Sequence, residues 1–314
     1  MENLVFSLNA TVPIFMMMVL GMFFRKVKLI DARFTASLNQ FVFKAALPAV
    51  LFEDMSTSDF FQVWNTKFVL YCFFATLAEI LIAALISMLL KDKSLRGEFI
   101  QGAYRSSAAI LGIAFIKNIY GNAGLGPLMI LASVPLYNVI AVTVLSLTRP
   151  GSGGLDGNVL KKTLKGIVTN PIILGIAIGA LWSVLRIPQP RIMQKTVSNL
   201  AQVATPLGLI AMGADFDFEK IKGSVLPSAA ASALKLVGFC AVFLPIAVAL
   251  GFREEQLVAI LVMLGSATTV SCYVMARNMG HEGVLTSSVV ALTTCASAFS
   301  LTFWLYVVKT AGWI

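Results

Sequence analysis

The sequence predicts an all-α polytopic membrane protein with ten transmembrane helices. We expect two inverted five-helix repeats in which the discontinuous helices 4 and 9 cross. Composition predicts the class, because 58% of the 314 residues are hydrophobic and 12% are charged, against about 25% charged residues in soluble proteins. The mean hydropathy is +0.86. Apolar runs of bilayer-spanning length follow one another, without the alternation of apolar and polar residues that a membrane β-barrel shows. An internal sequence repeat predicts that the helices form two repeats of five.

Ten apolar runs are long enough to cross a bilayer. We predict them at residues 4–24, 34–54, 68–90, 99–117, 125–147, 170–187, 196–214, 225–250, 256–276 and 284–308. The first run follows no basic segment and precedes no clear small-residue cleavage site. We therefore expect a retained helix there and not a signal peptide.

The second half of the chain repeats landmarks of the first half. At an offset of 158 the matches are Pro13 with Pro171, Gly21 with Gly179 and Pro48 with Pro206. At an offset of 159 they are Ser107 with Ser266, Ala108 with Ala267, Gly121 with Gly280 and Gly124 with Gly283. We predict repeats at 1–148 and 170–314, joined by a Gly/Ser-rich linker at 149–169. Five spans is an odd number, so the second repeat enters from the opposite side, as in many secondary transporters.

Basic residues predict the orientation. With the N-terminus outside, 14 Lys and Arg residues fall in the inner loops and 7 in the outer loops and tail. Positive charge collects in cytoplasmic loops, so both termini are expected outside. The net charge of +9 then reflects membrane topology, and we expect no nucleic-acid partner.

Two matching stretches of small and hydroxylated residues interrupt the apolar pattern. The first holds Ser106, Ser107, Ala108 and Gly112, and the second holds Ser266, Ala267, Thr268, Thr269 and Ser271. Small residues allow helices to pack closely, which is one interpretation. Spans that are interrupted by small, polar residues at corresponding positions of two repeats also indicate a transport site. The second interpretation predicts that the substrate binds where span 4 crosses span 9.

A charge inside a membrane span is costly, and the predicted spans hold Lys44, Glu79, Arg105 and Lys235, with Glu53 and Asp54 at the end of span 2. Lys44 is expected to be structural, and three of these residues and Asn138 are candidates for a role in transport. Glu79 and Lys235 occupy corresponding spans 3 and 8. They form either a structural ion pair or a site where Glu79 takes up a coupling proton and Lys235 offsets an anion. Arg105, near the inner end of span 4, faces lipid headgroups or guides an anion. Asn138, three residues after Pro135, serves interhelical hydrogen bonding or orients the substrate.

No enzyme constellation is present. The chain lacks GxSxG, HExxH and P-loop motifs. Its four cysteines form no CxxC pair, so we expect neither a zinc site nor a disulfide framework, and no metal. No soluble segment is long enough for a nucleotide-binding domain. We expect no enzyme and no cofactor, with coupling to H⁺ or Na⁺ left open.

Several segments in this order resemble the auxin efflux carrier family, which includes plant auxin carriers and bacterial permeases for malate and malonate. The segments are VPIFMMMVLGMFFRK, YRSSAAILGIAF, PLYNVIA, ATPLGLIAMGADFDFEKIK and ALKLVGFCAVFLP. The resemblance implies a dimerising scaffold at 1–58 and 170–222 and a transport domain at 59–148 and 223–314. The chain lacks the long loop of the plant carriers and their prolines in the crossing stretches, which favours a bacterial-type permease.

Residues and resemblance together predict a secondary transporter of a small organic anion that works by alternating access. The expected substrate is a carboxylate such as malate, malonate or an auxin-like acid. The expected setting is a lipid bilayer, namely a plasma membrane or bacterial inner membrane, with a homodimer formed through the scaffold helices. An anion channel and a non-transporting sensor with the same fold stay open as alternatives.

Overall fold

The computed structural model describes residues 13, 16–57, 64–108, 112–121, 125–149, 165–166, 168–215 and 224–314. Within these ranges the protein is helical and no strand is present. The predicted linker 149–169 lies mostly outside the described residues, as do the domain boundaries at 58/59 and 222/223. Five helices are long and apolar enough to cross a membrane, and they confirm a multi-pass membrane protein. They are Thr66–Ser87, Gly126–Leu147, Arg191–Ala214, Val225–Ala249 and Val284–Thr310.

The helices of the first half begin with a helical segment at residues 16–26. They continue as α2 (Ala32–Phe41), the π-helix η1 (Val42–Ala46), α3 (Leu47–Ser56), α4 (Thr66–Ser87), the short η2 (Lys93–Leu95), α5 (Arg96–Tyr104), α6 (Ile113–Tyr120) and α7 (Gly126–Leu147). The first turn of α2 is stabilised by Asp31, whose carboxylate accepts the backbone N–H of Phe34 at 2.7 Å. Such a side chain satisfies a donor that the helix itself leaves open.

The second half follows the same order. Its helices are α9 (Pro171–Val184), α10 (Arg191–Gln202), α11 (Ala204–Ala214), α13 (Val225–Ala233), the π-helix η4 (Leu234–Gly238), α14 (Phe239–Ala249), α15 (Glu254–Gly265), α16 (Ser271–Asn278) and α17 (Val284–Thr310). In both halves a pair of short helices replaces one long one, α5 with α6 and α15 with α16. Each half is too short to cross a bilayer alone. Among the described residues, α9 is also short, with 14 residues, and the π-helix η1 separates α2 from α3, so fewer continuous spans are counted than the sequence predicts.

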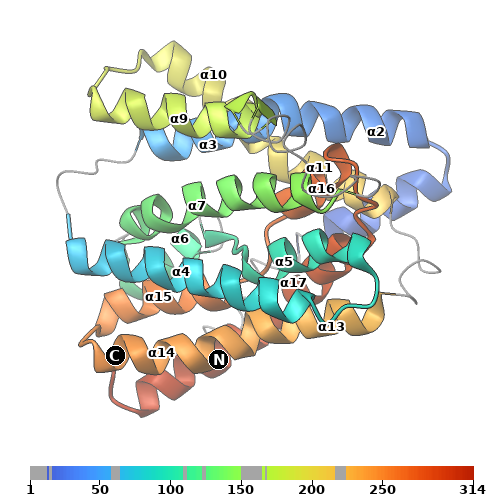
Figure 1. Ribbon diagram of the computed structural model, residues 1–314. Helices are drawn as coiled ribbons and strands as arrows, with labels where there is room; N and C mark the ends of the chain where they lie inside the picture. The colour runs from blue at the N-terminus through green and yellow to red at the C-terminus, as the bar shows by residue number, and fades with distance from the viewer. Residues whose placement is uncertain are drawn as a thin grey trace.

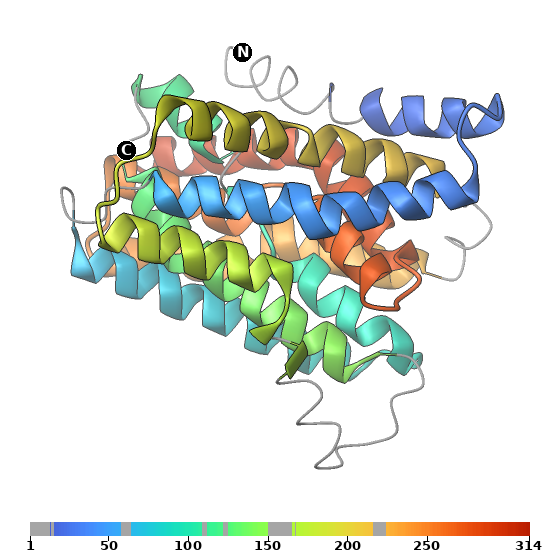
Figure 2. The same cartoon turned by 90° about the horizontal axis from the view of Figure 1, so that it is seen from above.

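The helices lie roughly parallel in layers. Figure 1 shows α2, α3, α9 and α10 on one side and α4, α13, α14 and α15 on the other, with α7 and α16 between them. Figure 2, seen from above, shows the long α2–α3 segment lying between α9 and the α10–α11 segment. The buried core is formed by the inner helices, and α15 is buried along most of its length. The two interrupted helices therefore meet in the interior of the protein.

Glycines hold the outer layer closely together. A Cβ atom on Gly21 would collide with the carbonyl oxygen of Ile210 in α11, and one on Gly179 would lie 2.8 Å from the carbonyl oxygen of Phe52 in α3. Backbone therefore touches backbone at both places, as small residues allow in membrane helices.

Candidate functional site

The two interruptions face each other. α5 ends at Tyr104, and Arg105 is extended with φ −74° and ψ 126°. α15 ends at Gly265, and Ser266 is extended with φ −74° and ψ 161°. The extended residues pair across the gap, because Ser106 and Thr268 form an isolated antiparallel bridge. The breaks therefore fall at the two small-residue stretches of the sequence, and the pairing satisfies backbone groups that hydrocarbon would leave without partners.

Further hydrogen bonds hold the crossing together. The backbone N–H of Ser107 donates to the carbonyl of Ala267 at 2.9 Å, and the hydroxyl of Ser106 donates to the carbonyl of Met263. Thr268 donates from its hydroxyl to the Gly102 carbonyl at 2.8 Å. Its backbone N–H in turn donates to the hydroxyl of Thr293 in α17 at 3.0 Å. These bonds tie the extended residues to α5, α15 and α17.

A cavity of about 100 Å³ lies beside the crossing. Nine of the predicted site residues line it: Arg105, Ser106, Ser107, Ala108, Asn138, Ala267, Thr268, Thr269 and Ser271. The opposite wall comes from α3, with Leu47, Val50, Leu51 and Asp54, joined by Ala204 and Thr205 of α11. The sequence prediction did not include this wall. The spacing 47, 50, 51 and 54 marks one helix face, which was the signal available for it.

Four predicted site residues do not line the cavity. Gly112 packs against α15, where an added Cβ would lie 2.9 Å from Cγ1 of Val262. Ser266 is fully buried behind the crossing. Glu79 and Lys235 form a separate buried pair. For these four the structure gives packing and capping contacts in place of cavity positions.

Arg105 is the cation of the cavity and is only 2% exposed. Its Nη2 donates to Asn138 Oδ1 and to Ser271 Oγ, each at 2.8 Å. Its Nη1 lies 2.8 Å from the sulfur of Met275 and 3.5 Å from Oε1 of Gln101. All of these acceptors are neutral, and Nε has no hydrogen-bond partner. Among the residues that the structure describes, Arg105 forms no ion pair.

Asn138 in α7 is held in one orientation. Its Oδ1 accepts from Arg105 at 2.8 Å, and its Nδ2 donates to the carbonyl of Val134 at 2.9 Å. Because both ends of the amide are fixed, Asn138 holds the guanidinium against the cavity wall.

Lys235 caps the ends of both interrupted helices. Its ammonium group donates to the carbonyls of Tyr104 at 3.1 Å, Leu264 at 2.7 Å and Met263 at 3.4 Å. The last carbonyls of a helix have no partner within the helix and carry partial negative charge, so one cation stabilises both ends. Glu79 Oε1 lies 4.0 Å from the ammonium, and both side chains are fully buried.

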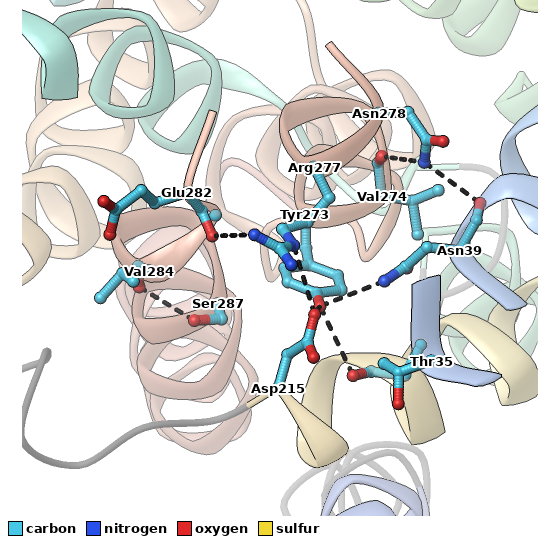
Figure 3. Close-up of polar contacts among 12 residues, drawn as sticks. Thr35, Asn39, Asp215, Tyr273, Val274, Arg277, Asn278, Glu282, Val284 and Ser287 are labelled. Atoms are coloured by element: carbon cyan, nitrogen blue, oxygen red, sulfur yellow. Dashed lines mark hydrogen bonds and ion pairs between the residues drawn. The ribbon is translucent and has the colours of Figure 1, made fainter. Parts of the chain in front are cut away.

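A polar cluster links α2 and α11 to α16 (Figure 3). We call its members Asn39, Asp215, Tyr273, Arg277 and Asn278 the interface cluster. The Tyr273 hydroxyl donates to Asp215 Oδ2 at 2.7 Å and accepts from Asn39 Nδ2 at 3.3 Å. Arg277 forms an ion pair with Asp215 at 3.2 Å, and Asn278 donates to the backbone carbonyl of Asn39 at 3.1 Å.

A second, wider cleft of about 770 Å³ lies beyond the interface cluster. It is lined by α2, including Arg33 and Asn39, and by the end of α16 with the turn after it, including Arg277 and His281. On α16 the small cavity is reached at Val274 and the cleft at Arg277. These two residues are three positions apart, about 4.5 Å along a helix, and the interface-cluster residues Asn39, Arg277 and Asn278 themselves line the cleft.

No group of three or more His, Cys, Asp or Glu side chains in the described part of the chain could hold a metal ion. The chemistry available at the crossing is therefore hydrogen bonding and charge.

Known proteins resemble this chain in sequence and in fold. A family model described as "Membrane transport protein" matches residues 6–305. A protein of Rhizobium meliloti (strain 1021) named "Putative malonate transporter" is 25% identical over 301 residues, covering 88% of this chain and 87% of that protein. The sodium proton antiporter MjNhaP1 from Methanocaldococcus jannaschii, whose structure was determined at pH 8, is similar in fold. Its TM-score is 0.63 at 13% identity, covering 95% of this chain and 97% of that one.

The family match spans nearly the whole chain, and the family model and the Rhizobium meliloti relative are both described as transport proteins, not as enzymes. The chain belongs to the membrane transport protein family, which is the family of the auxin efflux carriers.

Proposed function

We propose that this protein is a secondary active transporter of a small organic anion, and that the anion binds to Arg105 in the cavity at the crossing. The observation that carries this proposal is the environment of Arg105. A buried charge in a membrane protein is costly and marks a functional site unless it is paired. Arg105 has only neutral partners among the described residues, and its Nε–H is unused. A carboxylate in the cavity would supply the missing negative charge.

The proposed substrate is a small carboxylate. Arg forms its strongest contacts with planar carboxylates, which match the fork of its N–H groups. The cavity volume of about 100 Å³ is several times the roughly 10–15 Å³ that one water molecule requires, so the cavity has room for a small organic acid. A compact acid such as malonate or malate fits this space better than a larger, aromatic auxin-like acid. The name of the Rhizobium meliloti relative supports the same class.

We also propose ten spans in two inverted repeats. Support comes from the glycine contacts of the outer layer. Gly21 touches Ile210, and Gly179 touches Phe52. The repeat offset of 158 found in the sequence converts Gly21 into Gly179 and Phe52 into Ile210. Each contact is thus the image of the other with the two halves exchanged, which is what an internal two-fold relation between repeats requires.

The small cavity and the wide cleft near the interface cluster support a mechanism of alternating access. We propose that α4–α7 and α13–α17 form the moving transport domain and that the segments 16–56 and 171–214 form the scaffold and the dimer contact. The interface cluster joins the scaffold residues Asn39 and Asp215 to Tyr273 of the transport domain. We propose that this cluster separates the cavity from the wide cleft in the present state and opens when substrate passes between them.

The topology proposal places both termini outside a bacterial inner membrane. Cysteine substitutions at residue 2 and at Gly312, in a background without the four native cysteines, test it. Labelling of both by an impermeant reagent from outside agrees with the proposal. Labelling of either one only from the cytosolic side would contradict the inverted arrangement.

Transport is tested with purified protein in liposomes. A carrier gives saturable malonate uptake that is accelerated by unlabelled malonate on the opposite side. A channel gives flux without this counterflow, and a sensor binds malonate with no flux. Parallel assays with an imposed H⁺ or Na⁺ gradient identify the coupling ion, for which the fold shared with a sodium proton antiporter gives a reason to look.

A further inference from the structure

The cavity has a second charged residue. Asp54 lies on α3 and lines the same space as Arg105. It shares one helix face with Leu47, Val50 and Leu51, so the wall around it on its own helix is apolar. Among the described residues that line the cavity, Asp54 supplies the one carboxyl group and Arg105 the one basic side chain. One comes from the proposed scaffold and the other from the proposed transport domain.

The presence of both Asp54 and Arg105 in one cavity restricts which anions the cavity accepts. A monocarboxylate can bind Arg105 through its single carboxylate, and the apolar part of the ligand can then contact the apolar side chains of α3. A dicarboxylate bound to Arg105 through one group must place its other carboxyl group within the same small space as Asp54. Two carboxylates that share a confined site do not both stay ionised. The second carboxyl group can then enter only together with a proton.

We propose that a dicarboxylate binds here together with one proton, which is shared between its distal carboxyl group and Asp54. This inference rests on the proposed anion site at Arg105 and identifies both the substrate class and the coupled ion. The balance is simple. One proton leaves the solvent, an O–H···O⁻ hydrogen bond forms between the two carboxyl groups, and no other bond changes. The loaded cavity carries one negative charge fewer than it would with the dianion alone.

The charged groups around Asp54 come from several packed elements. On α3 its neighbour is Glu53. The helix α9, which packs along α3, has no titratable side chain. Among the described residues of the other elements packed against α3, Arg191 and Lys195 of α10 and Lys44 of η1 are basic and exposed, and Arg105 lines the same cavity.

Glu53 gives a matched control. It is the same kind of acid one position earlier in the same helix, but it does not line the cavity. The substitutions Asp54→Asn and Glu53→Gln each remove one negative charge at nearly the same depth. A general electrostatic effect would appear in both variants, whereas a proton held at the site depends on Asp54 alone.

The experiment is isothermal titration calorimetry of the purified full-length protein at pH 7.5 in buffers that differ in ionisation enthalpy. Three ligands are compared: malonate, monomethyl malonate and acetate. We expect wild type to take up about one proton per malonate and none with the two monoanions. Malonate affinity should fall about tenfold per pH unit on the alkaline side, as for any ligand that binds with one proton. Asp54→Asn should abolish the proton uptake, and Glu53→Gln should keep it.

Malonate binding to wild type without proton uptake would overturn the inference and leave the anion site in place. Proton uptake that persists in Asp54→Asn would also overturn it. Absence of binding by all three acids would instead refute the anion site itself. The comparison between malonate and its half-ester uses wild-type protein only, so the inference stays testable if Asp54→Asn does not fold.

Discussion

Replacing Arg105 with methionine tests the anion site most directly. The change keeps a long, flexible side chain and removes the charge. A guanidinium has five N–H donors, and here Nη1 and Nη2 are directed at neutral acceptors of the protein while Nε–H is unused. A bound carboxylate therefore gains the attraction of a charge that has no ion-pair partner among the described residues, and a hydrogen bond where it takes the place of one of these neutral acceptors.

The size of the effect follows from these two contributions. A hydrogen bond to a charged group contributes about 1.5–3 kcal/mol. Two unit charges 4 Å apart attract by about 4 kcal/mol at an effective dielectric constant of about 20. Part of this gain is offset by desolvation of the anion, so we take about 3 kcal/mol as the net loss on removal of the charge. We therefore expect the dissociation constant for malonate to rise roughly 100-fold.

The assay is calorimetric titration of purified protein at constant ionic strength, with folding checked by gel filtration and thermal unfolding. Ser271→Ala is the control, because it removes one acceptor of Arg105 and keeps the charge. We expect it to weaken binding less than about tenfold, the effect of one hydrogen bond. Arg105→Lys should recover part of the affinity, since it restores charge but not the planar fork. A folded Arg105→Met protein that binds malonate as tightly as wild type would refute the site.

Three other substitutions test the crossing, its cap and the interface cluster. Ala267→Leu should abolish transport while the protein still folds, because the larger side chain fills a cavity of about 100 Å³. Normal flux in this variant would show that the small residues serve helix packing only. Lys235→Met should lower the yield of folded protein strongly, since breaking a buried ion pair costs about 3–5 kcal/mol, and adding Glu79→Gln should restore part of it, as measured by fluorescence-detected gel filtration. Tyr273→Phe removes the hydroxyl shared by the interface cluster and should increase labelling from the cytosolic side of a cysteine placed at Thr205, whereas unchanged labelling would show that the cluster does not close the cavity.

The class and the family could be predicted from the sequence because both depend on patterns within single segments. Apolar runs identify a membrane protein, and small polar residues within them indicated where α5 and α15 end. The residues of the crossing that line the cavity were found in the same way. Asn138 also lines the cavity, since an amide in an apolar helix needs partners nearby, and its contact with substrate stays a prediction.

Contacts between distant segments could not be predicted in this way. Lys235 was expected to face the substrate, but its ammonium contacts the ends of α5 and α15, which lie far from it in the chain. Tyr273 meets partners 58 and 234 positions away, and nothing in its own segment indicates them. Asp54 was read as the end of a span, although α3 continues to Ser56 and turns this residue toward the cavity.

The reciprocal glycine contacts of the outer layer have a consequence for biosynthesis. Contacts that exchange with each other under a two-fold relation are those of an isologous interface, in which identical surfaces of two subunits meet. Here both surfaces belong to one chain, so neither half can bury its glycine face without the other. The helix that Gly21 touches is not complete until residue 210 of 314 has been synthesised. The helical segment at residues 16–26 therefore lacks this partner until that part of the chain has been synthesised.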